Sequence, residues 1–355
     1  MGYTMKPSRN GTAMAEHRAH ETEAVHAGAG ASTLSVTPAD IAAAAERIRP
    51  FVHCTPLLSC ASLARRSGCD LRLKAEHLQR SGSFKLRGAL NRLLLLSAEQ
   101  RQRGVVAFSS GNHAQGVALA GRLLGIPATI VMPSDAPPVK LEATRGYGAE
   151  IVLYDRQRED REAIARRLAD EEGRTLVPPF DDPAVIAGQG TIGLELAAQW
   201  PEFEIALVPI GGGGLISGIA LALKTLRPEV RVIGVEPEVA DDARQSLAEG
   251  RIVRIAQPNT IADGVATQAV GRHTFPIMSA LVDEVVTVTE GEIAAALEFL
   301  LTRSKQVVEP TGALTTAVAL AGRVPLAGRR VMALLCGGNL DLRALPAILA
   351  KAPSA

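Results

Sequence analysis

The sequence predicts an α/β fold with two open, twisted and mainly parallel sheets flanked by helices. Apolar runs of strand length alternate with helical patterns, which favours parallel strands joined by right-handed crossovers. Hydrophobic residues make up 47% of the 355-residue chain but aromatic residues only 3%. The core must therefore consist of Ala, Val, Leu and Ile, as in buried parallel strands. A proline-rich segment at 178–183 indicates a junction between two domains.

The individual elements follow from the length and period of the apolar runs. We expect strands at 71–74, 105–108, 128–132, 150–153, 205–210, 231–235, 284–288 and 330–336. We expect helices at 115–124, 158–172, 191–199, 216–226, 290–301 and 315–321. No repeat of fixed period is visible, which argues against a solenoid. Two open sheets of this kind place a ligand in the cleft at the carboxyl ends of their strands.

These elements suggest three parts of the chain. Residues 36–100 and 181–350 are expected to form a large domain, and residues 101–180 a small domain. Residues 1–35 are rich in Ala, His, Gly, Ser and Glu and lack the apolar region of a secretory signal, so we expect a disordered tail. An over-long start is the alternative, because Met5 and Met14 could also begin the chain.

Composition excludes several classes of protein. The chain has 38 basic and 37 acidic residues, so its charge favours neither nucleic acid nor an anionic membrane as a partner. No apolar run is long enough to span a bilayer. The four cysteines form no C-x-x-C pair, which favours reduced thiols and a cytoplasmic protein over a disulfide framework or a zinc site.

A lysine stands among small polar residues in the segment SGSFKLRGA, residues 81–89. If Ser83 caps the following helix, Lys85 lies in its first turn, where a cation opposes the helix dipole. One interpretation is a surface lysine beside a capping serine. The other is an amine of lowered pKa that is ready to form an imine.

Four glycines, Gly211, Gly212, Gly213 and Gly214, separate an apolar strand from a helix. Such a turn lets backbone amides converge beside a helix N-terminus, which is how proteins bind phosphate. The segment lacks the Walker lysine and the dinucleotide spacing, so it does not favour a nucleoside triphosphate or NAD. A merely flexible loop is the alternative.

Two more turns follow predicted strands. The turn SSGNH, residues 109–113, offers amides and hydroxyls that could hold a carboxylate, although a simple helix cap is the alternative. His113 is more often a structural histidine in such a place, and we give it no catalytic role. Cys336 ends another strand, where a buried apolar cysteine is common.

An acidic segment, residues 236–242, follows the strand at 231–235. Carboxylates and free carbonyls in one loop suit a hard cation such as Mg²⁺, Mn²⁺ or Ca²⁺. The alternative is a solvated acidic loop.

Taken together, these segments resemble the serine/threonine dehydratase family of pyridoxal-phosphate enzymes, which has the tryptophan-synthase-β type of fold (fold type II) with its active site in the interdomain cleft. The resemblance runs from about Pro50 to Asn339, and its segments stand in the family's order. They are SGSFKLRGA, SSGNHAQG, VMPSDAPPVKLEATRGYGAE, PFDDPAVIAGQGTIGLE, PIGGGGLISG, GVEPEVADD, VEPTGA and CGGN.

The resemblance implies a role for each matching residue. Lys85 would bind pyridoxal 5'-phosphate as an imine, and the other cofactor contacts would be Phe84 beside the ring, Asn112 at the phenolic oxygen, Gly211, Gly212, Gly213, Gly214 and Leu215 at the phosphate, and Cys336 at the pyridine nitrogen. The substrate carboxylate would be held by Ser109, Ser110, Gly111, Asn112 and His113. The cation site would consist of Glu236, the carbonyl of Ala240 and Asp242.

The implied reaction is elimination of water and ammonia from L-threonine or L-serine, which gives a 2-oxo acid. Freed Lys85 would remove the α-proton, and the cofactor would delocalise the resulting charge. Most family members have serine in place of Cys336. A neutral thiol there does not stabilise a full positive charge on the pyridine nitrogen. This suits elimination, because the carbanion is consumed at once when the leaving group departs.

Other functions stay open. Serine racemase is the nearest, because Ser110 stands where racemases place a second proton carrier, although many dehydratases share this serine. Phe180 favours a dehydratase, since racemases place an asparagine there. Other β-hydroxy amino acids, such as 3-hydroxyaspartate or a phenylserine, are further candidates. A non-catalytic member that only binds the cofactor or an amino acid is disfavoured, because Lys85 and the glycines are intact.

The resemblance also carries expectations about assembly and control. A homodimer or homotetramer is usual for this family. The chain ends about 16 residues after Asn339, so we expect the catabolic type without the regulatory domain of isoleucine-inhibited deaminases.

Overall fold

The computed structural model describes residues 1–2, 34–136 and 138–353. The chain from Leu34 onward forms one compact unit. The predicted tail lies almost entirely outside the described residues. Within them, no helix is long and apolar enough to cross a membrane.

Two separate sheets are present, as the sequence predicts. The larger sheet has the strand order β1 (Leu57–Ser59), β2 (Asp70–Lys74), β10 (Arg330–Leu334), β7 (Ile205–Pro209), β8 (Arg231–Pro237) and β9 (Glu284–Val288), with only β1 antiparallel. The smaller sheet is fully parallel, in the order β5 (Glu150–Tyr154), β4 (Ala128–Pro133), β3 (Val105–Phe108) and β6 (Thr175–Leu176). The fold class is thereby confirmed.

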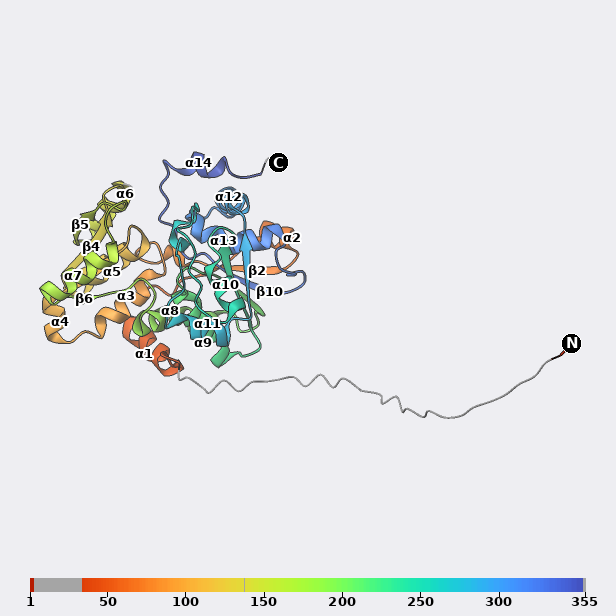
Figure 1. Ribbon diagram of the computed structural model, residues 1–355, viewed down its shortest axis with the longest axis horizontal. Helices are drawn as coiled ribbons and strands as arrows, with labels where there is room; N and C mark the ends of the chain where they lie inside the picture. Colours follow the sequence, from red (N-terminus) through yellow and green to blue (C-terminus); the bar gives the residue numbers. More distant parts are fainter. Residues whose placement is uncertain (3–33, 137, 354–355) are drawn as a thin grey trace. The chain divides into compact units, whose positions relative to one another are not determined.

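Helices flank both sheets, and Figure 1 shows the smaller sheet with α5–α7 beside the larger sheet with α9–α13. In chain order the helices are α1 (Pro38–Ile48), α2 (Ala61–Ser67), η1 (Glu76–Leu78), α3 (Lys85–Leu94), α4 (Ala98–Arg103), α5 (Asn112–Leu124), α6 (Pro138–Gly146), α7 (Arg161–Glu172), α8 (Pro183–Gln199), α9 (Gly214–Leu226), α10 (Asp242–Glu249), η2 (Asp263–Val265), α11 (Thr274–Leu281), α12 (Glu290–Phe299), the π-helical turn η3 (Leu300–Ser304), α13 (Pro310–Ala321) and α14 (Leu345–Leu349).

The differences from the predicted elements lie mainly at their ends. All eight predicted strands form, but β1 and β6 were missed because three and two residues are too short to show a period. Helix α8 begins at Pro183, eight residues before its predicted start at 191. The side chain of Asp182 accepts a hydrogen bond from the backbone N–H of Val185, and proline suits the first helical position.

Helix α9 begins at the end of the glycine turn that follows β7, and it packs closely on α8. Gly218 of α9 makes the approach possible, because a Cβ there would lie 2.4 Å from the carbonyl oxygen of Ile186. No side chain fits at that distance.

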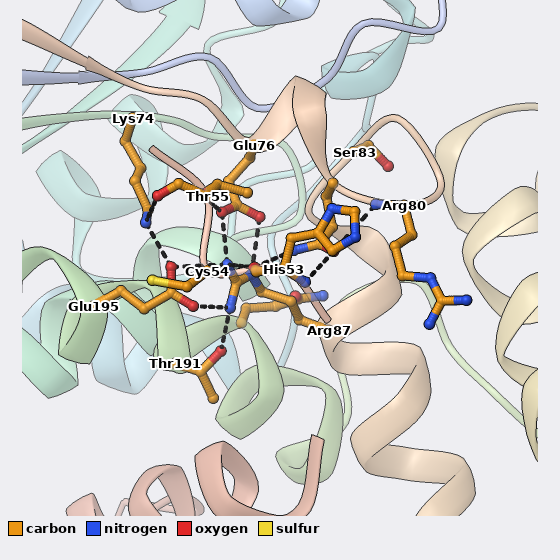
Figure 2. Close-up of polar contacts among 12 residues, drawn as sticks. His53, Cys54, Thr55, Lys74, Glu76, Arg80, Ser83, Arg87, Thr191 and Glu195 are labelled. Atoms are coloured by element: carbon orange, nitrogen blue, oxygen red, sulfur yellow. Dashed lines mark hydrogen bonds and ion pairs between the residues drawn. The ribbon is translucent and has the colours of Figure 1, made fainter. Parts of the chain in front are cut away.

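A buried network of charges anchors α3 to β2 and α8 (Figure 2). The Arg87 guanidinium bonds to both oxygens of Glu76 at 2.8 and 2.9 Å, and to Glu195 at 2.7 Å. Lys74 donates to Glu195 at 2.5 Å and to the carbonyl of Thr55 at 2.8 Å. The first turn of α3 is therefore fixed against both neighbours.

Candidate active site

A cavity of about 150 Å³ lies between the two sheets. Every residue predicted to contact cofactor or substrate lines it, namely Phe84, Lys85, Ser109, Ser110, Gly111, Asn112, His113, Gly211, Gly212, Gly213, Gly214, Leu215 and Cys336. The turns that carry most of these residues follow β3, β7 and β10, so the cavity lies at the carboxyl ends of parallel strands, as expected for an open α/β sheet.

Lys85 is the first residue of α3, and its Nζ donates a hydrogen bond of 2.6 Å to the carbonyl of Pro179. Burial of the amine lowers its pKa to about 8, against a smaller opposing effect of Cys336. About a tenth of the amine is then neutral at pH 7, far more than for an ordinary lysine, and the neutral amine is the nucleophilic form.

The predicted cap of α3 is wrong. Phe84 occupies the cap position without a side-chain hydrogen bond, and the Ser83 hydroxyl is buried with no partner among the described residues. The backbone of Ser83 instead forms a β-bridge with Gly337, and the N–H of Phe84 donates to the carbonyl of Cys336. This pairing holds Ser83 away from the helix start.

The glycine turn at 211–214 is enclosed so tightly that larger residues would not fit. A Cβ on Gly212 would lie 2.3 Å from the ring of Phe180, and Gly213 has a φ of +90°. The turn leads directly into α9, whose N-terminus carries positive potential. A small anionic group is what such a turn binds.

The 109–113 turn joins β3 to α5 at the edge of the cavity. Helix α5 begins at Asn112, and the N–H of Gly111 donates to the hydroxyl of Ser109 at 3.1 Å. Burial, with a further contribution from Lys85, lowers the pKa of His113 to about 3. His113 is therefore neutral and donates from Nε2 to the carbonyl of Val177 at 2.9 Å, a structural position.

Cys336 is buried, and its thiol donates to the carbonyl of Thr311 at 3.5 Å. Burial raises its pKa well above the usual value, so the thiol stays neutral. It lines the cavity as a weakly polar group without charge.

The three predicted metal ligands do not line the cavity. Glu236 accepts hydrogen bonds from the backbone N–H groups of Ala243 and Arg244 at 3.0 and 2.9 Å. Both carboxyl oxygens of Asp242 are buried and have no hydrogen-bond partner among the residues that the structure describes, and burial raises the pKa of this group to about 7. The described residues contain no cluster of three His, Cys, Asp or Glu side chains suited to a metal, so any site here would need the Ala240 carbonyl.

Sequence reasoning missed several residues that line the cavity, including Lys140, Arg161, Asp263, Glu309 and Thr311. Lys140 of α6 forms an ion pair with Asp263 of η2 across the cleft. Glu309 is buried and accepts a hydrogen bond from the side chain of Asn112. Glu309 and Lys140 lie inside the quoted segments VEPTGA and VMPSDAPPVKLEATRGYGAE, but no local pattern separates them from other charged residues.

A buried amine of lowered pKa and a glycine turn at a helix N-terminus line one cavity, and an enzyme that holds a phosphorylated carbonyl compound needs both features. The family model described as "Pyridoxal-phosphate dependent enzyme" matches residues 48–337. The chain belongs to this family.

Known proteins agree with this assignment. The chain is 49% identical to L-threo-3-hydroxyaspartate ammonia-lyase of Saccharomyces cerevisiae, over 86% of this chain and 94% of that one. It is 46% identical to serine racemase of Schizosaccharomyces pombe, over 85% and 94%. Among solved structures, that of maize serine racemase superposes with a TM-score of 0.85 at 41% identity, over 89% of this chain and 98% of that one.

Proposed function

We propose that this protein is a pyridoxal-phosphate-dependent ammonia-lyase that converts a β-hydroxy L-amino acid into a 2-oxo acid and ammonia. The observation that carries the proposal is the meeting of Lys85, the glycine turn and the 109–113 turn in one cavity. Racemisation of the same substrates is the second candidate, because Ser110 lines the same cavity as Lys85.

The residues present fit the cofactor. The crowded glycine turn leaves backbone amides for the phosphate, and Lys85 offers a partly neutral amine for covalent attachment. Asn112 would contact the phenolic oxygen and Cys336 the pyridine nitrogen, with Phe84 beside the ring. When bound, the cofactor withdraws electrons from the substrate α-carbon and so makes its proton removable.

The chain's own residues would carry the remaining steps. Backbone amides of the 109–113 turn orient the substrate carboxylate. The neutral Lys85 amine takes the α-proton, and its lowered pKa keeps part of it in the required form. The β-hydroxyl leaves as water after it gains a proton, and hydrolysis of the remaining carbon–nitrogen bond yields the 2-oxo acid and ammonia. Walls on both sides of the cavity restrict water during proton transfer.

Among β-hydroxy amino acids, we propose that one with a second carboxylate, such as 3-hydroxyaspartate, is preferred over threonine and serine. Lys140 and Arg161 both line the cavity. The Arg161 guanidinium lies over the ring of Phe108 and makes no side-chain hydrogen bond or ion pair within the described part of the chain. A guanidinium whose N–H groups are not used suits a carboxylate, since two parallel N–H groups can reach both oxygens. The yeast relative named for 3-hydroxyaspartate supports the same choice.

The test is product analysis on L-threo-3-hydroxyaspartate, L-threonine, L-serine and a phenylserine, with both 2-oxo acid and enantiomer measured. We expect 2-oxo acid from several of them and the highest kcat/KM with 3-hydroxyaspartate. Arg161→Met should lower kcat/KM for 3-hydroxyaspartate selectively, whereas Arg166→Met, which removes an exposed partner of Glu162, should not. No 2-oxo acid from any substrate would contradict the lyase proposal.

We also propose a divalent cation at Glu236, the Ala240 carbonyl and Asp242. The buried oxygens of Asp242, which have no hydrogen-bond partner in the described part of the chain, support this, because buried carboxylates normally have a hydrogen-bond partner or a metal. Such an ion would act on stability, since its ligands do not line the cavity.

A further inference from the structure

The side chain of Asn339 connects two segments that line the cavity. Its Nδ2 donates to the carbonyl of Ser81 at 2.9 Å and to Oδ1 of Asn112 at 2.8 Å. The amide lies against Gly82, where a Cβ would be 2.4 Å from Oδ1 of Asn339 and where φ is +73°. Only glycine leaves room for Asn339 at this point.

The segment that carries Asn339 is fastened to the segment that leads into Lys85. Gly338 donates its N–H to the carbonyl of Gly82 at 2.8 Å, and Phe84 donates to the carbonyl of Cys336 at 3.1 Å. The position of Asn339 is therefore fixed relative to the start of α3.

The hydrogen bonds of Asn339 and Glu309 show where the oxygen and the nitrogen of the Asn112 side-chain amide lie. An Nδ2 group has two hydrogens and only donates. Both hydrogens of Asn339 are used, one of them on Oδ1 of Asn112. The Nδ2 of Asn112 donates one hydrogen to Glu309, which leaves its other hydrogen for the cavity.

We propose that Asn339 is a positioning residue that holds the Asn112 amide with its N–H, and not its carbonyl, directed at the phenolic oxygen of the cofactor. This inference rests on the proposed function. A donor stabilises the negative form of that oxygen, whereas a carbonyl would repel it.

Glu309 cannot supply this orientation alone. Burial raises the pKa of Glu309, with Asp263 adding to the effect, so the carboxyl holds a proton over part of the neutral range. A protonated carboxyl can donate as well as accept, and it would bond equally to either end of the Asn112 amide. Asn339, which only donates through Nδ2, removes that ambiguity.

The test is Asn339→Asp, which keeps the shape of the side chain but removes both donated hydrogens. We expect the visible absorbance band of the holoenzyme to shift and the pH dependence of this band to change. The value of kcat should fall by about tenfold, because the hydrogen bond from Asn112 to the charged phenolic oxygen is lost. Asn259→Asp is the control, because it adds the same charge at an exposed position and should change neither band nor kcat.

A double-mutant cycle with Asn112→Ala separates positioning from general disruption. If Asn339 acts through Asn112, Asn339→Asp should shift the band little further once Asn112 is absent, and equal shifts in both backgrounds would overturn the proposal. Should the Asp variant not fold, the same cycle with Asn339→Ala decides it. A parent protein with no cofactor band would instead contradict the proposed function, and a parent band left unchanged by Asn339→Asp would overturn only the role of Asn339.

Discussion

Arg87 and Lys85 stand two residues apart in the first turn of α3 but face very different surroundings. Two residues correspond to about 200° around a helix, so their side chains leave on nearly opposite sides. Arg87 is fully buried and bonds to Glu76, Glu195 and Thr191. Lys85 lines the cavity, and within the described residues its amine has one hydrogen-bond partner, the carbonyl of Pro179, and lies over the ring of Phe84.

The pKa values reflect this contrast. Burial opposes the charge on Arg87, but Glu76 and Glu195 outweigh it and keep its pKa above the usual value. No carboxylate in the described part of the chain forms an ion pair with Lys85 to compensate for burial, and its pKa falls to about 8. A fully partnered charge stabilises the fold, whereas a charge left without compensation supplies chemistry.

The largest expected effect is the loss of turnover when Lys85 is replaced. Lys85→Met should lower turnover by at least about 1000-fold, because both cofactor attachment and α-proton removal lose their amine. The free energy of unfolding should change by no more than about 1 kcal/mol, since no ion pair is broken. Steady-state assays of the holoenzyme and urea unfolding of the cofactor-free protein measure the two quantities. A large loss of stability would show that Lys85 belongs to the structural network.

Arg87→Met should show the reverse pattern. It leaves the buried carboxylate of Glu76 without its ion-pair partner and the partly buried carboxylate of Glu195 with Lys74 alone, and breaking a buried pair typically costs about 3–5 kcal/mol. Urea unfolding of the cofactor-free protein measures this loss. Arg66→Met, at an exposed position of α2, is the control and should unfold like the parent. A stability loss as small as that of the control would contradict the structural role of the network.

Ser110 distinguishes elimination from racemisation. Elimination needs one base, whereas racemisation needs a second proton carrier on the other face of the substrate. Ser110→Ala should therefore reduce racemisation, and dehydration of D-substrates, on the order of 100-fold, with a much smaller effect on L-substrates. Chiral product analysis measures both. An equal loss in all activities would mean that Ser110 only binds substrate or shapes the turn.

Asp242 is a third buried ionisable group to compare with Arg87 and Lys85, and its carboxyl group lacks any partner among the described residues. If a divalent cation binds there and its free concentration is a hundred times its dissociation constant, it stabilises the folded state by about 2.7 kcal/mol. A chelator should then lower the melting temperature of the parent protein by several degrees, and much less in Asp242→Ala. A melting temperature that excess chelator leaves unchanged would remove the metal from this site.

The smallest effect concerns pH. With a pKa of about 8, roughly a tenth of the Lys85 amine is neutral at pH 7 and most of it at pH 9. The rate at which cofactor-free protein attaches pyridoxal phosphate should therefore rise about tenfold over this range and level off above it. Stopped-flow absorbance measures the rate. A rise that continues steadily to pH 10 would mean that the amine has the ordinary pKa of lysine.

Sequence patterns predicted the parts of the site that lie within single segments. The glycine turn and the 109–113 turn each follow a strand, so their place at the carboxyl edge of a sheet could be inferred locally. Lys140 and Asp263 could not be found in this way, because they meet only when the two sheets pack. Ser83 misled the prediction, since its backbone pairs with a distant partner, Gly337, in place of capping the helix.

The most direct test of the central claim is to map the residue that carries the cofactor. Holoenzyme reduced with borohydride and digested should yield one modified peptide, SGSFKLRGA or a longer fragment containing it, with the added mass on Lys85 in tandem mass spectrometry. Attachment to any other lysine, or no modified peptide from a protein that retains its visible band, would contradict the assignment of Lys85 as the reactive amine of the cavity.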